Sequence, residues 1–378
     1  MKEKVLILAS VASMIDQFNI PNIKLLQNIG YEVHVACNFE KGSSCSFEKI
    51  QILKELLKKL NVKYYQINFE RNILKIGNNL KAYKEVKNIL IENKYKFLHC
   101  HSPIGGVIGR IAGHRTQTKV IYTAHGFHFF KGAPLINWIL YYPIEKYLSK
   151  YTDVLITINQ EDYKRAQIFS AKKVKYIPGV GIDIEKIKNI KVNKKEKRAE
   201  FGLNEENIVL LSVGELNKNK NHSVVIKALA KINNPNIYYL ICGQGNLKGE
   251  LLNLAKKLNL EKNVKLLGFR KDIYEICKIS DIFIFPSRRE GLGLAALEGM
   301  CSGLPLISSN IHGIRNYTEN ERTGYCVNRF DVSGFEKAIK KLGFNRELRQ
   351  KMGNYNRKIV KKFDIHKVNK IIKNIYNN

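Results

Sequence analysis

Two series of short apolar runs, each followed by a segment of helical period, constrain the fold of this chain more than any other feature. The runs predict strands at residues 5–9, 32–36, 63–67, 97–100, 120–123 and 154–157, and again at 208–212, 237–242, 264–267, 282–285 and 306–308. Repeated strand–helix–strand units are typical of parallel sheets covered by helices. The sequence therefore predicts an α/β fold with two doubly wound, Rossmann-like domains that face each other across a cleft.

The boundary between the two domains is predicted near residue 180. The segment IPGVGIDIE (177–185) has the proline and glycines of a hinge, and the run KVNKKEKR (191–198) is strongly charged. We expect an N-terminal domain over residues 1–180 and a C-terminal domain over 181–360. A last helix over 361–378 is a candidate to pack back on the N-terminal domain. Because ligands of such sheets bind beyond the carboxyl ends of the strands, the residues after each strand are the candidate site residues.

The charge of the chain suggests an anionic partner. It carries 64 Lys and Arg against 33 Asp and Glu, a net charge of +31 that is shared between both halves. Such a diffuse excess fits an anionic membrane surface or phosphate-bearing substrates better than a nucleic-acid patch. Solvated, lysine-rich faces without a partner are an equally open interpretation.

Targeting and redox features point to the cytoplasm. No apolar run approaches the ~20 residues of a membrane-spanning helix, and the start MKEKVLILAS is typical of a first strand rather than a signal peptide. The seven cysteines are scattered, without a C-x-x-C pair, which favours reduced thiols. We expect a cytoplasmic protein, with peripheral contact to the inner face of the plasma membrane as an option.

The segment DIFIFPSRREGLGLAALEGMCSGLPLISS (281–309) carries the most informative chemical pattern. A buried strand is followed by a polar loop, Glu290, and a helix that starts within GLGLAALE. Gly291 and Gly293 would let a ligand approach the backbone, and the free N–H groups at the start of a helix suit a phosphate. Glu298 lies eight residues after Glu290, about 12 Å along a helix. The two carboxylates could therefore bind hydroxyl groups at the two ends of a nucleotide sugar.

Two other interpretations of this segment compete with a sugar-nucleotide site. A capped surface helix with two solvated glutamates has the same spacing. The pattern Gly291-x-Gly293-x-x-Ala296 also matches a dinucleotide fingerprint. However, five residues separate the strand from the glycines, and no acidic residue lies between Glu298 and Glu319. Both facts argue against a nicotinamide enzyme.

These residues, with several others in order, resemble a known family. EGLGLAALE followed by GMCSGLPLISS resembles the signature of the retaining GT-B glycosyltransferases (glycosyltransferase family 4-like), which include mannosyl-, glucosyl- and N-acetylhexosaminyltransferases. The segments LLSVGELNKNKNH (210–222), YLICGQGNLKGEL (239–251), VKLLGFRKDI (264–273) and HGIRNYTENERTGYCV (312–327) resemble the rest of its donor domain. The segment at 121–148 is similar to bacterial exopolysaccharide and capsule glycosyltransferases.

The resemblance implies a role for each matching residue of the donor domain. Glu290 should face the transferred sugar, and Glu298 should bind the ribose hydroxyls. Lys220 should pair with the diphosphate as the leaving group gains charge, so that no metal cofactor is needed. The implied donor-binding residues are Gly214, Glu215, Lys220, Gly243, Phe269, Arg270, Gly291, Gly293, Leu294 and Glu298, of which Gly293 and Leu294 should offer backbone N–H groups to the diphosphate.

One residue departs from the family pattern. Glu215 stands where the family usually has arginine, in a G-R pair after the first strand of the donor domain. A carboxylate beside a diphosphate is repulsive. We therefore expect Glu215 to turn away or to bond a neighbouring cation or backbone group, with Lys218 or Arg288 as sources of the missing positive charge.

In the first half, TAHGFH (123–128) follows a predicted strand. The resemblance implies that His125 contacts the donor hexose and acts with Glu290 and Lys220 in catalysis. Acceptor contacts are implied for His128, for Asp16, and for Ser13, which stands roughly where the family has a glycine after the first strand.

The motif HCHS (99–102) suggests a metal site, because His99 and His101 would share one face of a strand. No further ligands cluster at metal spacing and no Asp-x-Asp motif is present, so we expect no metal site and interpret the histidines as the floor of the cleft. The segment 127–147 holds seven aromatic residues with Lys131 and Lys146. It suits either a membrane interface or a helix packed on the sheet.

The expected function is transfer of a hexose or N-acetylhexosamine from a nucleotide sugar, UDP-linked by our prediction, to a lipid-linked saccharide or a growing surface polysaccharide. The resemblance implies retention of the anomeric configuration by same-face substitution, and no nucleic-acid partner is expected. Two alternatives stay open. One is a UDP-sugar epimerase of the same fold, and the other is a non-catalytic basic protein that binds membranes or nucleic acid. The second alternative leaves Glu290 and Glu298 without a role.

Overall fold

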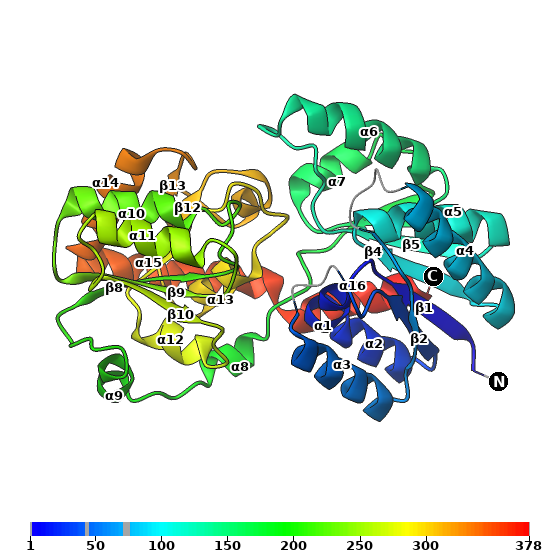
Figure 1. The fold of residues 1–378 in the computed structure, drawn as a ribbon, viewed down its shortest axis with the longest axis horizontal. Coiled ribbons are helices and arrows are strands. Elements are labelled where there is room, and N and C mark those ends of the chain that lie inside the picture. The colour runs from blue at the N-terminus through cyan, green and yellow to red at the C-terminus, as the bar shows by residue number, and fades with distance from the viewer. Residues whose placement is uncertain (1, 42–44, 71–75, 378) are drawn as a thin grey trace. The chain divides into compact units, whose positions relative to one another are not determined.

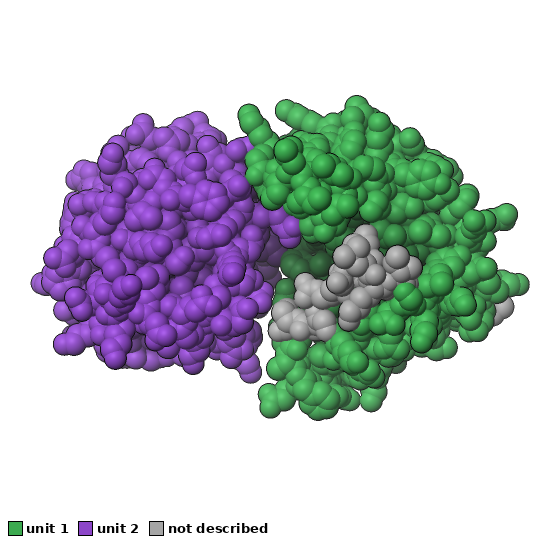
Figure 2. Space-filling model, turned by 45° about the horizontal axis from the view of Figure 1, so that its top comes forward, with its two compact units in different colours: residues 1–180, 367–378 green, residues 181–366 purple. Residues whose placement is uncertain are grey.

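The computed structural model describes residues 2–41, 45–70 and 76–377. The chain forms two compact units, coloured separately in Figure 2. Unit 1 comprises residues 1–180 together with 367–378, and unit 2 comprises residues 181–366. The polypeptide therefore passes between the units twice. None of the helices formed by the described residues combines the length and the apolar composition that crossing a bilayer requires.

Unit 1 is built on a sheet of seven parallel strands in the order β3-β2-β1-β4-β5-β6-β7 (Figure 1). The order reverses at β1, which pairs with both β2 and β4, and the carboxyl ends of strands at such a point are the usual ligand position. The strands are β1 (Lys4–Leu8), β2 (Glu32–Cys37), β3 (Lys63–Gln66), β4 (Phe97–His101), β5 (Lys119–Ala124), β6 (Val154–Thr157) and β7 (Lys173–Tyr176). The helices are α1 (Ala12–Phe18), α2 (Ile20–Asn28), α3 (Phe47–Lys59), α4 (Ile76–Asn93), α5 (Pro103–Thr116), α6 (Leu135–Ser149), α7 (Gln160–Ala166) and most of α16 (Ile365–Asn377).

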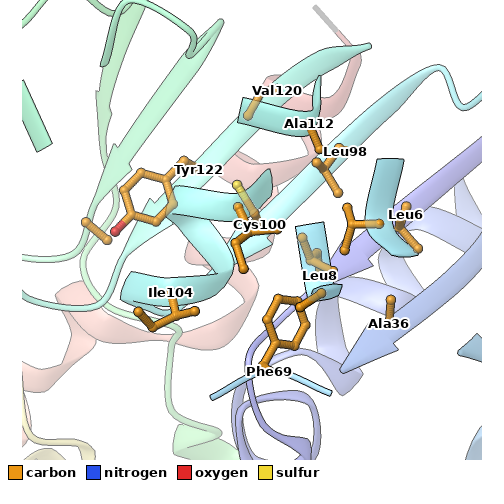
Figure 3. Packing of buried hydrophobic residues seen from close by; sticks show 14 of the residues in the cluster. Leu6, Leu8, Ala36, Phe69, Leu98, Cys100, Ile104, Ala112, Val120 and Tyr122 are labelled. Atoms are coloured by element: carbon orange, nitrogen blue, oxygen red, sulfur yellow. The ribbon is translucent and has the colours of Figure 1, made fainter. Parts of the chain in front are cut away.

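Alternate strand residues in unit 1 face two different helical layers. On one face Leu8 and Cys100 pack with Ile104 of α5, as Figure 3 shows. Helix α5 approaches this face closely because it carries glycines, and a Cβ added to Gly106 would collide with the ring of Tyr122. Since side chains alternate along a strand, neighbours of the opposite parity face the other layer, where Tyr376 of α16 lies.

Unit 2 repeats the architecture with six parallel strands in the order β10-β9-β8-β11-β12-β13. Here the order reverses at β8, which lies between β9 and β11. The strands are β8 (Ile208–Val213), β9 (Ile237–Cys242), β10 (Val264–Gly268), β11 (Ile282–Phe285), β12 (Leu306–Ser309) and β13 (Gly324–Val327). The helices are α8 (Ile184–Lys188), α9 (Lys194–Ala199), α10 (His222–Ile232), α11 (Lys248–Lys257), α12 (Ile273–Ile279), α13 (Leu294–Cys301), η1 (His312–Asn316), α14 (Val332–Gly343), α15 (Arg346–Ile359) and η2 (Val360–Phe363).

The predicted fold class is confirmed, because both units are doubly wound parallel α/β sheets. Two strands, β7 and β13, were absent from the sequence prediction. Both are four-residue strands at the edge of their sheets with partly exposed residues; β7 (KVKY) has no apolar run, and β13 (GYCV) has one of only three residues. All seven cysteines are free and five are buried, which agrees with the predicted reduced thiols in apolar cores.

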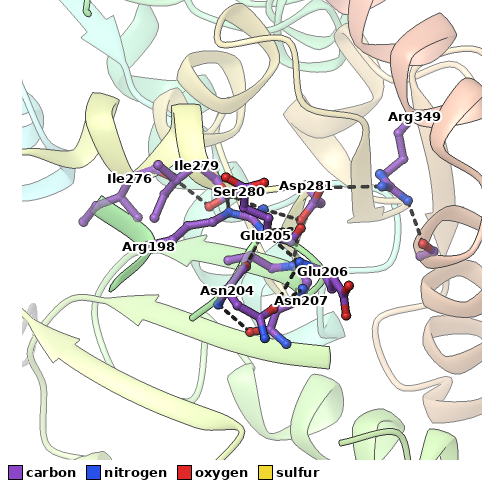
Figure 4. A network of polar contacts seen from close by, with 12 residues as sticks. Arg198, Asn204, Glu205, Glu206, Asn207, Ile276, Ile279, Ser280, Asp281 and Arg349 are labelled. Carbon is purple, nitrogen blue, oxygen red and sulfur yellow. Dashed lines mark hydrogen bonds and ion pairs between the residues drawn. The ribbon is translucent and has the colours of Figure 1, made fainter. Parts of the chain in front are cut away.

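A polar network closes the amino ends of β8 and β11, at the opposite edge of the unit 2 sheet from the strand carboxyl ends (Figure 4). The Arg198 guanidinium donates to the carbonyl oxygens of Ile279 (2.8 Å) and Asn207 (3.0 Å), and to the Asp281 carboxylate (2.9 Å). Asp281 also accepts from the backbone N–H of Val209. Arg198 is 9% exposed, so these buried acceptors depend on it.

Replacing Arg198 with methionine is expected to lower the free energy of unfolding of unit 2 by about 3 kcal/mol, because several buried acceptors lose their donor at once. Urea titration followed by circular dichroism measures this change. The exposed Lys195 on the same helix provides the control, and Lys195→Met should leave stability nearly unchanged. Equal stability of the two variants would contradict the structural role of Arg198.

Candidate active site

Two loops meet at the carboxyl ends of β8 and β11 in unit 2. The backbone N–H of Arg288 donates to the carbonyl of Asn219 (2.7 Å), and the Asn219 side-chain amide donates to the carbonyl of Arg289 (3.0 Å). The buried Asn221 adds bonds from its amide to the carbonyl oxygens of Pro286 (3.1 Å) and Arg329 (2.8 Å). These bonds hold the loop at residues 218–221 (KNKN) beside the loop at residues 286–293, which precedes α13.

Lys220 and Glu290 form an ion pair between these two loops, although they lie 70 residues apart in the sequence. Ser287 donates a second hydrogen bond to the same carboxylate oxygen, Oε1 (3.1 Å). The side chains are 21% and 14% exposed, so the pair is accessible to a ligand. The structure therefore brings two of the predicted catalytic residues together, and Ser287 is a partner that the sequence analysis missed.

Gly214 makes room for this lysine. A Cβ on Gly214 would lie 3.1 Å from Cε of Lys220, so the lysine side chain passes directly over the glycine. Gly243, after β9, lies against the Gly214 carbonyl, where an added Cβ would collide with the backbone. The two predicted glycines thus form a flat surface beside the ammonium group.

Helix α13 starts at the same edge of the sheet. Its N-cap, Gly293, has φ of 91°, and a Cβ there would lie 2.5 Å from the ring of Phe285. The preceding carbonyl of Leu292 accepts a hydrogen bond from Tyr317 Oη (2.7 Å), and the Glu290 carbonyl accepts one from the backbone N–H of Gly313 (3.2 Å). The start of an eight-residue helix is therefore held firmly beside the Lys220–Glu290 pair, with its dipole suited to an anion.

Glu298 lies on α13. Its Oε1 accepts a hydrogen bond from the hydroxyl of Tyr274 (2.9 Å). Burial raises the pKa of Glu298 above the usual carboxyl value, while this hydrogen bond opposes the shift. Tyr274 is a second partner absent from the sequence analysis, and it leaves Oε2 as the oxygen available to a hydroxyl ligand.

Glu215 differs from one of the two arrangements expected for it, the bond to a neighbouring cation. Its side chain is exposed, and no ion pair joins it to another residue in the described part of the chain. The expected bond to a neighbouring cation is therefore not formed, and the alternative, that Glu215 turns away, fits its exposure. Arg288 donates to Asn221 Oδ1 from Nε (3.2 Å) and from Nη2 (3.1 Å), which keeps a positive charge next to Lys220 in the fold.

The segment 264–273 contains two of the implied donor-binding residues, Phe269 and Arg270. Phe269 is 57% exposed. The Arg270 guanidinium instead bonds the carboxylates of Asp272 and Glu200, and its hydrogen bond to Asp272 lowers the pKa of that carboxyl. Lys197 pairs with the same two carboxylates. The side chain of Arg270 is thus held by a local ion network, and the aromatic ring of Phe269 is the exposed group of this segment.

The candidates in unit 1 occupy different surroundings. His125 follows β5 and bonds His101, with Nε2 of His125 3.0 Å from Nδ1 of His101. Asp16 on α1 pairs with Lys49 of α3 (2.9 Å). The ring of His128 stacks on Tyr141 of α6, with ring centroids 4.5 Å apart. Ser13 lies within α1 and is half-buried.

The histidines of HCHS lie on β4. No group of three or more His, Cys, Asp or Glu side chains with metal-binding geometry occurs in the described ranges. His99 instead contacts two hydroxyl groups, Tyr376 Oη and Thr123 Oγ1, each at 2.8 Å.

Comparison with known proteins places this geometry in a family. Residues 4–159 match the family described as glycosyl transferase 4-like, and residues 193–359 match the glycosyl transferases group 1. EpsD of Bacillus subtilis (strain 168), named as a glycosyltransferase, is 34% identical over 371 residues, which cover 96% of this chain and 93% of EpsD. The chain belongs to the group 1 glycosyl transferases. A second relative of this glycosyltransferase, from Escherichia coli, is named UDP-Gal:alpha-D-GlcNAc-diphosphoundecaprenol alpha-1,3-galactosyltransferase; it is 31% identical over 98% of this chain and 95% of its own.

Solved structures match this glycosyltransferase in fold. Anabaena HepE in complex with UDP-glucose has a TM-score of 0.80 at 19% identity, over 99% of both chains. WaaG, a glycosyltransferase involved in lipopolysaccharide biosynthesis, has a TM-score of 0.74 at 17% identity, over 98% of this chain and 99% of WaaG. The predicted family and the predicted GT-B fold class are both confirmed.

Proposed function

We propose that this glycosyltransferase moves a hexose or N-acetylhexosamine from a UDP-linked donor to a lipid-linked saccharide or a growing surface polysaccharide, with retention of the anomeric configuration. The observation that carries the proposal is the accessible Lys220–Glu290 pair at the start of α13. It combines a cation for a diphosphate with a carboxylate for a sugar. The name of the Escherichia coli relative, with its UDP-Gal donor and diphosphoundecaprenol acceptor, supports the donor and acceptor classes.

In this proposal the diphosphate lies between Lys220 and the N-terminus of α13, where the N–H groups of Gly293 and Leu294 point to an anion. Glu290 binds the transferred sugar, Glu298 accepts from the ribose hydroxyls, and the exposed ring of Phe269 contacts the base. His125 contacts the hexose. Arg288 supplies the positive charge that the family usually has at the position of Glu215.

The proposed reaction is a same-face substitution. The acceptor hydroxyl oxygen forms the new bond to the anomeric carbon, the bond from that carbon to the diphosphate breaks, and the acceptor proton passes to the departing phosphate oxygen. Lys220 and the helix N-terminus stabilise the negative charge that grows on the leaving group. These fixed charges take the place of a metal ion, so the proposed enzyme is metal-independent.

A transfer assay tests this function. The purified protein is incubated in EDTA with radiolabelled UDP-hexoses or UDP-N-acetylhexosamines and an undecaprenyl-diphosphate-linked saccharide, and the lipid product is digested with α- and β-glycosidases. We expect an α-linked labelled lipid. Donor conversion without acceptor would indicate an epimerase, a β-linked product would exclude retention, and activity that needs added manganese would exclude metal independence.

We further propose that α6 of unit 1 contacts an anionic membrane surface, where a lipid-linked acceptor resides. Four large aliphatic side chains of this helix are exposed, by 49–80%, and helical spacing places them on one face: Leu135, Ile136, Ile139 and Leu140. The same face continues to Lys146 and Lys150, which line a hollow of about 430 Å³ with Tyr142, Pro143, Tyr147 and Ser170. Apolar side chains flanked by lysines suit the headgroup region of anionic lipids.

Vesicle sedimentation tests this surface. Leu135→Glu combined with Ile139→Glu is expected to weaken binding to vesicles with phosphatidylglycerol at least about tenfold, because two aliphatic groups no longer leave water. The control is Ile52→Glu, at an exposed aliphatic residue on α3. Binding by the double variant equal to that of the control would exclude α6 as the contact.

A further inference from the structure

Three histidine rings lie in a row at the carboxyl ends of β4 and β5. His99 and His101 belong to β4 and are fully buried, and His125 follows β5. The ring centroids of His99 and His101 are 4.1 Å apart, and those of His101 and His125 are 5.3 Å apart. The assigned functions above use His125 and leave the two buried rings without a role.

His99, at the end of the row opposite to His125, has a fixed ring orientation. Tyr376 Oη has His99 Nδ1 as its hydrogen-bond partner (2.8 Å), and a buried hydroxyl proton needs an acceptor, so we assign the hydroxyl as the donor. Nδ1 of His99 is then an acceptor, and Nε2 carries the proton that is donated to Thr123 Oγ1 (2.8 Å). Both nitrogens of His99 are therefore satisfied, and its fixed ring packs against His101 with an angle of 41° between the ring planes.

His101 differs, because only one of its nitrogens has a partner. Nδ1 lies 3.0 Å from Nε2 of His125, whereas Nε2 of His101 is buried without a hydrogen-bond partner among the described residues. A neutral imidazole carries one N–H. A buried N–H without an acceptor costs more than a buried lone pair without a donor, so the proton belongs on Nδ1. His101 then donates, and Nε2 of His125 accepts.

The rings stay neutral at physiological pH. Burial lowers the pKa of His99 to about 3 and that of His125 to about 4, and burial together with the neighbouring rings lowers the pKa of His101 well below its usual value. A neutral His125 that accepts at Nε2 must carry its proton on Nδ1. Since His125 is only half-buried, this N–H is the polar group that its ring offers to a ligand.

The backbone holds His101 in place. The next residue, Ser102, has φ of 66° and ψ of 155°, a region that non-glycine residues rarely adopt. Its Oγ accepts a hydrogen bond from the backbone N–H of Ser10 (3.0 Å) after β1 and contacts Ser10 Oγ at 2.9 Å. Such a conformation persists only when surrounding contacts fix it, so the end of β4 is a rigid support.

We propose that His101 is a positioning residue for the glycosyl transfer: it donates Nδ1–H to His125 and thereby fixes His125 as the tautomer that presents Nδ1–H to the substrate. The inference rests on the proposed function through the role of His125 at the sugar. Misplacing a catalytic group by about 1 Å costs on the order of 100-fold in rate, so we expect a loss of about 10- to 100-fold. The expected loss is in kcat, because the donor site in unit 2 keeps all its residues.

The tautomer is measured directly by NMR of the protein labelled with 15N-histidine, at pH 7 and without substrate. We expect His125 as the Nδ1–H form in the wild type and a mixture of both tautomers in His101→Leu. A wild-type His125 protonated on Nε2, or an unchanged Nδ1–H form in His101→Leu, would overturn the inference. Because the wild-type spectrum alone can refute it, the test does not depend on the folding of a variant.

Two amide variants form a matched pair for the kinetics. The amide nitrogen of asparagine lies as many bonds from Cβ as Nδ1 does, and that of glutamine as many as Nε2. We expect His101→Asn to retain most of kcat and the Nδ1–H form of His125, and His101→Gln to lose about 10- to 100-fold in kcat with little change in KM. Equal activities of the two variants would overturn the positioning role.

Transfer activity of His125→Ala distinguishes a failure of the proposed function from a failure of the positioning role of His101. If His125→Ala keeps full transfer activity, the assignment of His125 to the sugar is wrong, whatever the tautomer. If His125→Ala is inactive while His101→Gln is as active as wild type, the proposed function stands and the positioning by His101 is wrong.

Discussion

Glu290→Gln is expected to reduce turnover about 10²- to 10³-fold while UDP still binds. Glutamine keeps the shape of the side chain and can keep its bond to Ser287. It removes the charge that, in the proposed function, faces the transferred sugar as positive charge develops at the anomeric carbon. The loss should appear in kcat, because the interaction matters most in the transition state.

UDP binding to this variant has a further expected feature. In the wild type the Glu290 carboxylate pairs with Lys220, and an incoming diphosphate must share this ammonium group. Without the carboxylate, Lys220 has no such competitor, so UDP affinity should be retained or slightly increased. Calorimetric titration with UDP and initial rates with the correct donor measure the two effects.

The control for Glu290→Gln is Glu336→Gln, which also removes a carboxylate paired with a lysine. Glu336 bonds Lys340 on α14 (2.8 Å), in a helix outside the two loops of the site. This variant should have wild-type turnover. Unchanged turnover of Glu290→Gln would show that the carboxylate does not contact the reacting sugar.

Lys220→Ala is expected to weaken the binding of UDP and of the UDP-sugar together, by about 10- to 100-fold, because both ligands carry the diphosphate. Transfer should slow by a further factor, since the ammonium stabilises the charge that grows on the leaving group. Glu290 keeps its bond from Ser287, so the fold should tolerate the change, and thermal unfolding verifies this.

Two neighbours in the same loop serve as controls for Lys220→Ala. Glu215 and Lys218 are both exposed, and Glu215→Gln and Lys218→Ala should change UDP affinity much less. Calorimetric titration with UDP compares the three proteins. If Lys220→Ala binds UDP like the wild type while Glu215→Gln loses it, the diphosphate loop has been assigned the wrong way round.

The sequence was sufficient to predict the sheets because their central strands are continuous apolar runs. Strands β1 and β11, for example, are almost completely buried. The edge strands β7 and β13 were missed for the converse reason. The sequence KVKY of β7 alternates exposed and half-buried residues, and only its pairing with β6 makes it a strand.

The sequence could indicate candidate site residues, but it could not show which of them contact one another. The glycines and glutamates around α13 are local in the sequence, so their spacing alone indicated a phosphate site. The pairing of Lys220 with Glu290 depends on two loops that meet only in the folded sheet. The same is true of Tyr274 on Glu298, since a tyrosine in α12 has no local relation to a glutamate in α13.

Glu215 shows how an expectation from charge fails. Coulomb's law predicts that a carboxylate near a diphosphate is compensated, but a side chain can also rotate into water, where a high dielectric constant weakens the repulsion. Arg270 was predicted from its position in the motif. The carboxylates that hold it, Asp272 and Glu200, lie two and seventy residues away, and only the first is visible in the local sequence.

The last residues of the chain are part of the core of the first unit. Tyr376 is buried, bonds His99 and stacks on Phe97, with ring centroids 5.6 Å apart. On the ribosome, however, Phe97 and His99 emerge long before Tyr376, because all of unit 2 is synthesised in between. His99 and Tyr376 are 277 residues apart, so at 5–20 residues per second this interval lasts roughly 14 to 55 s. During that time unit 1 exposes the face that α16 will cover, so unit 1 can be completed only after unit 2 has been synthesised.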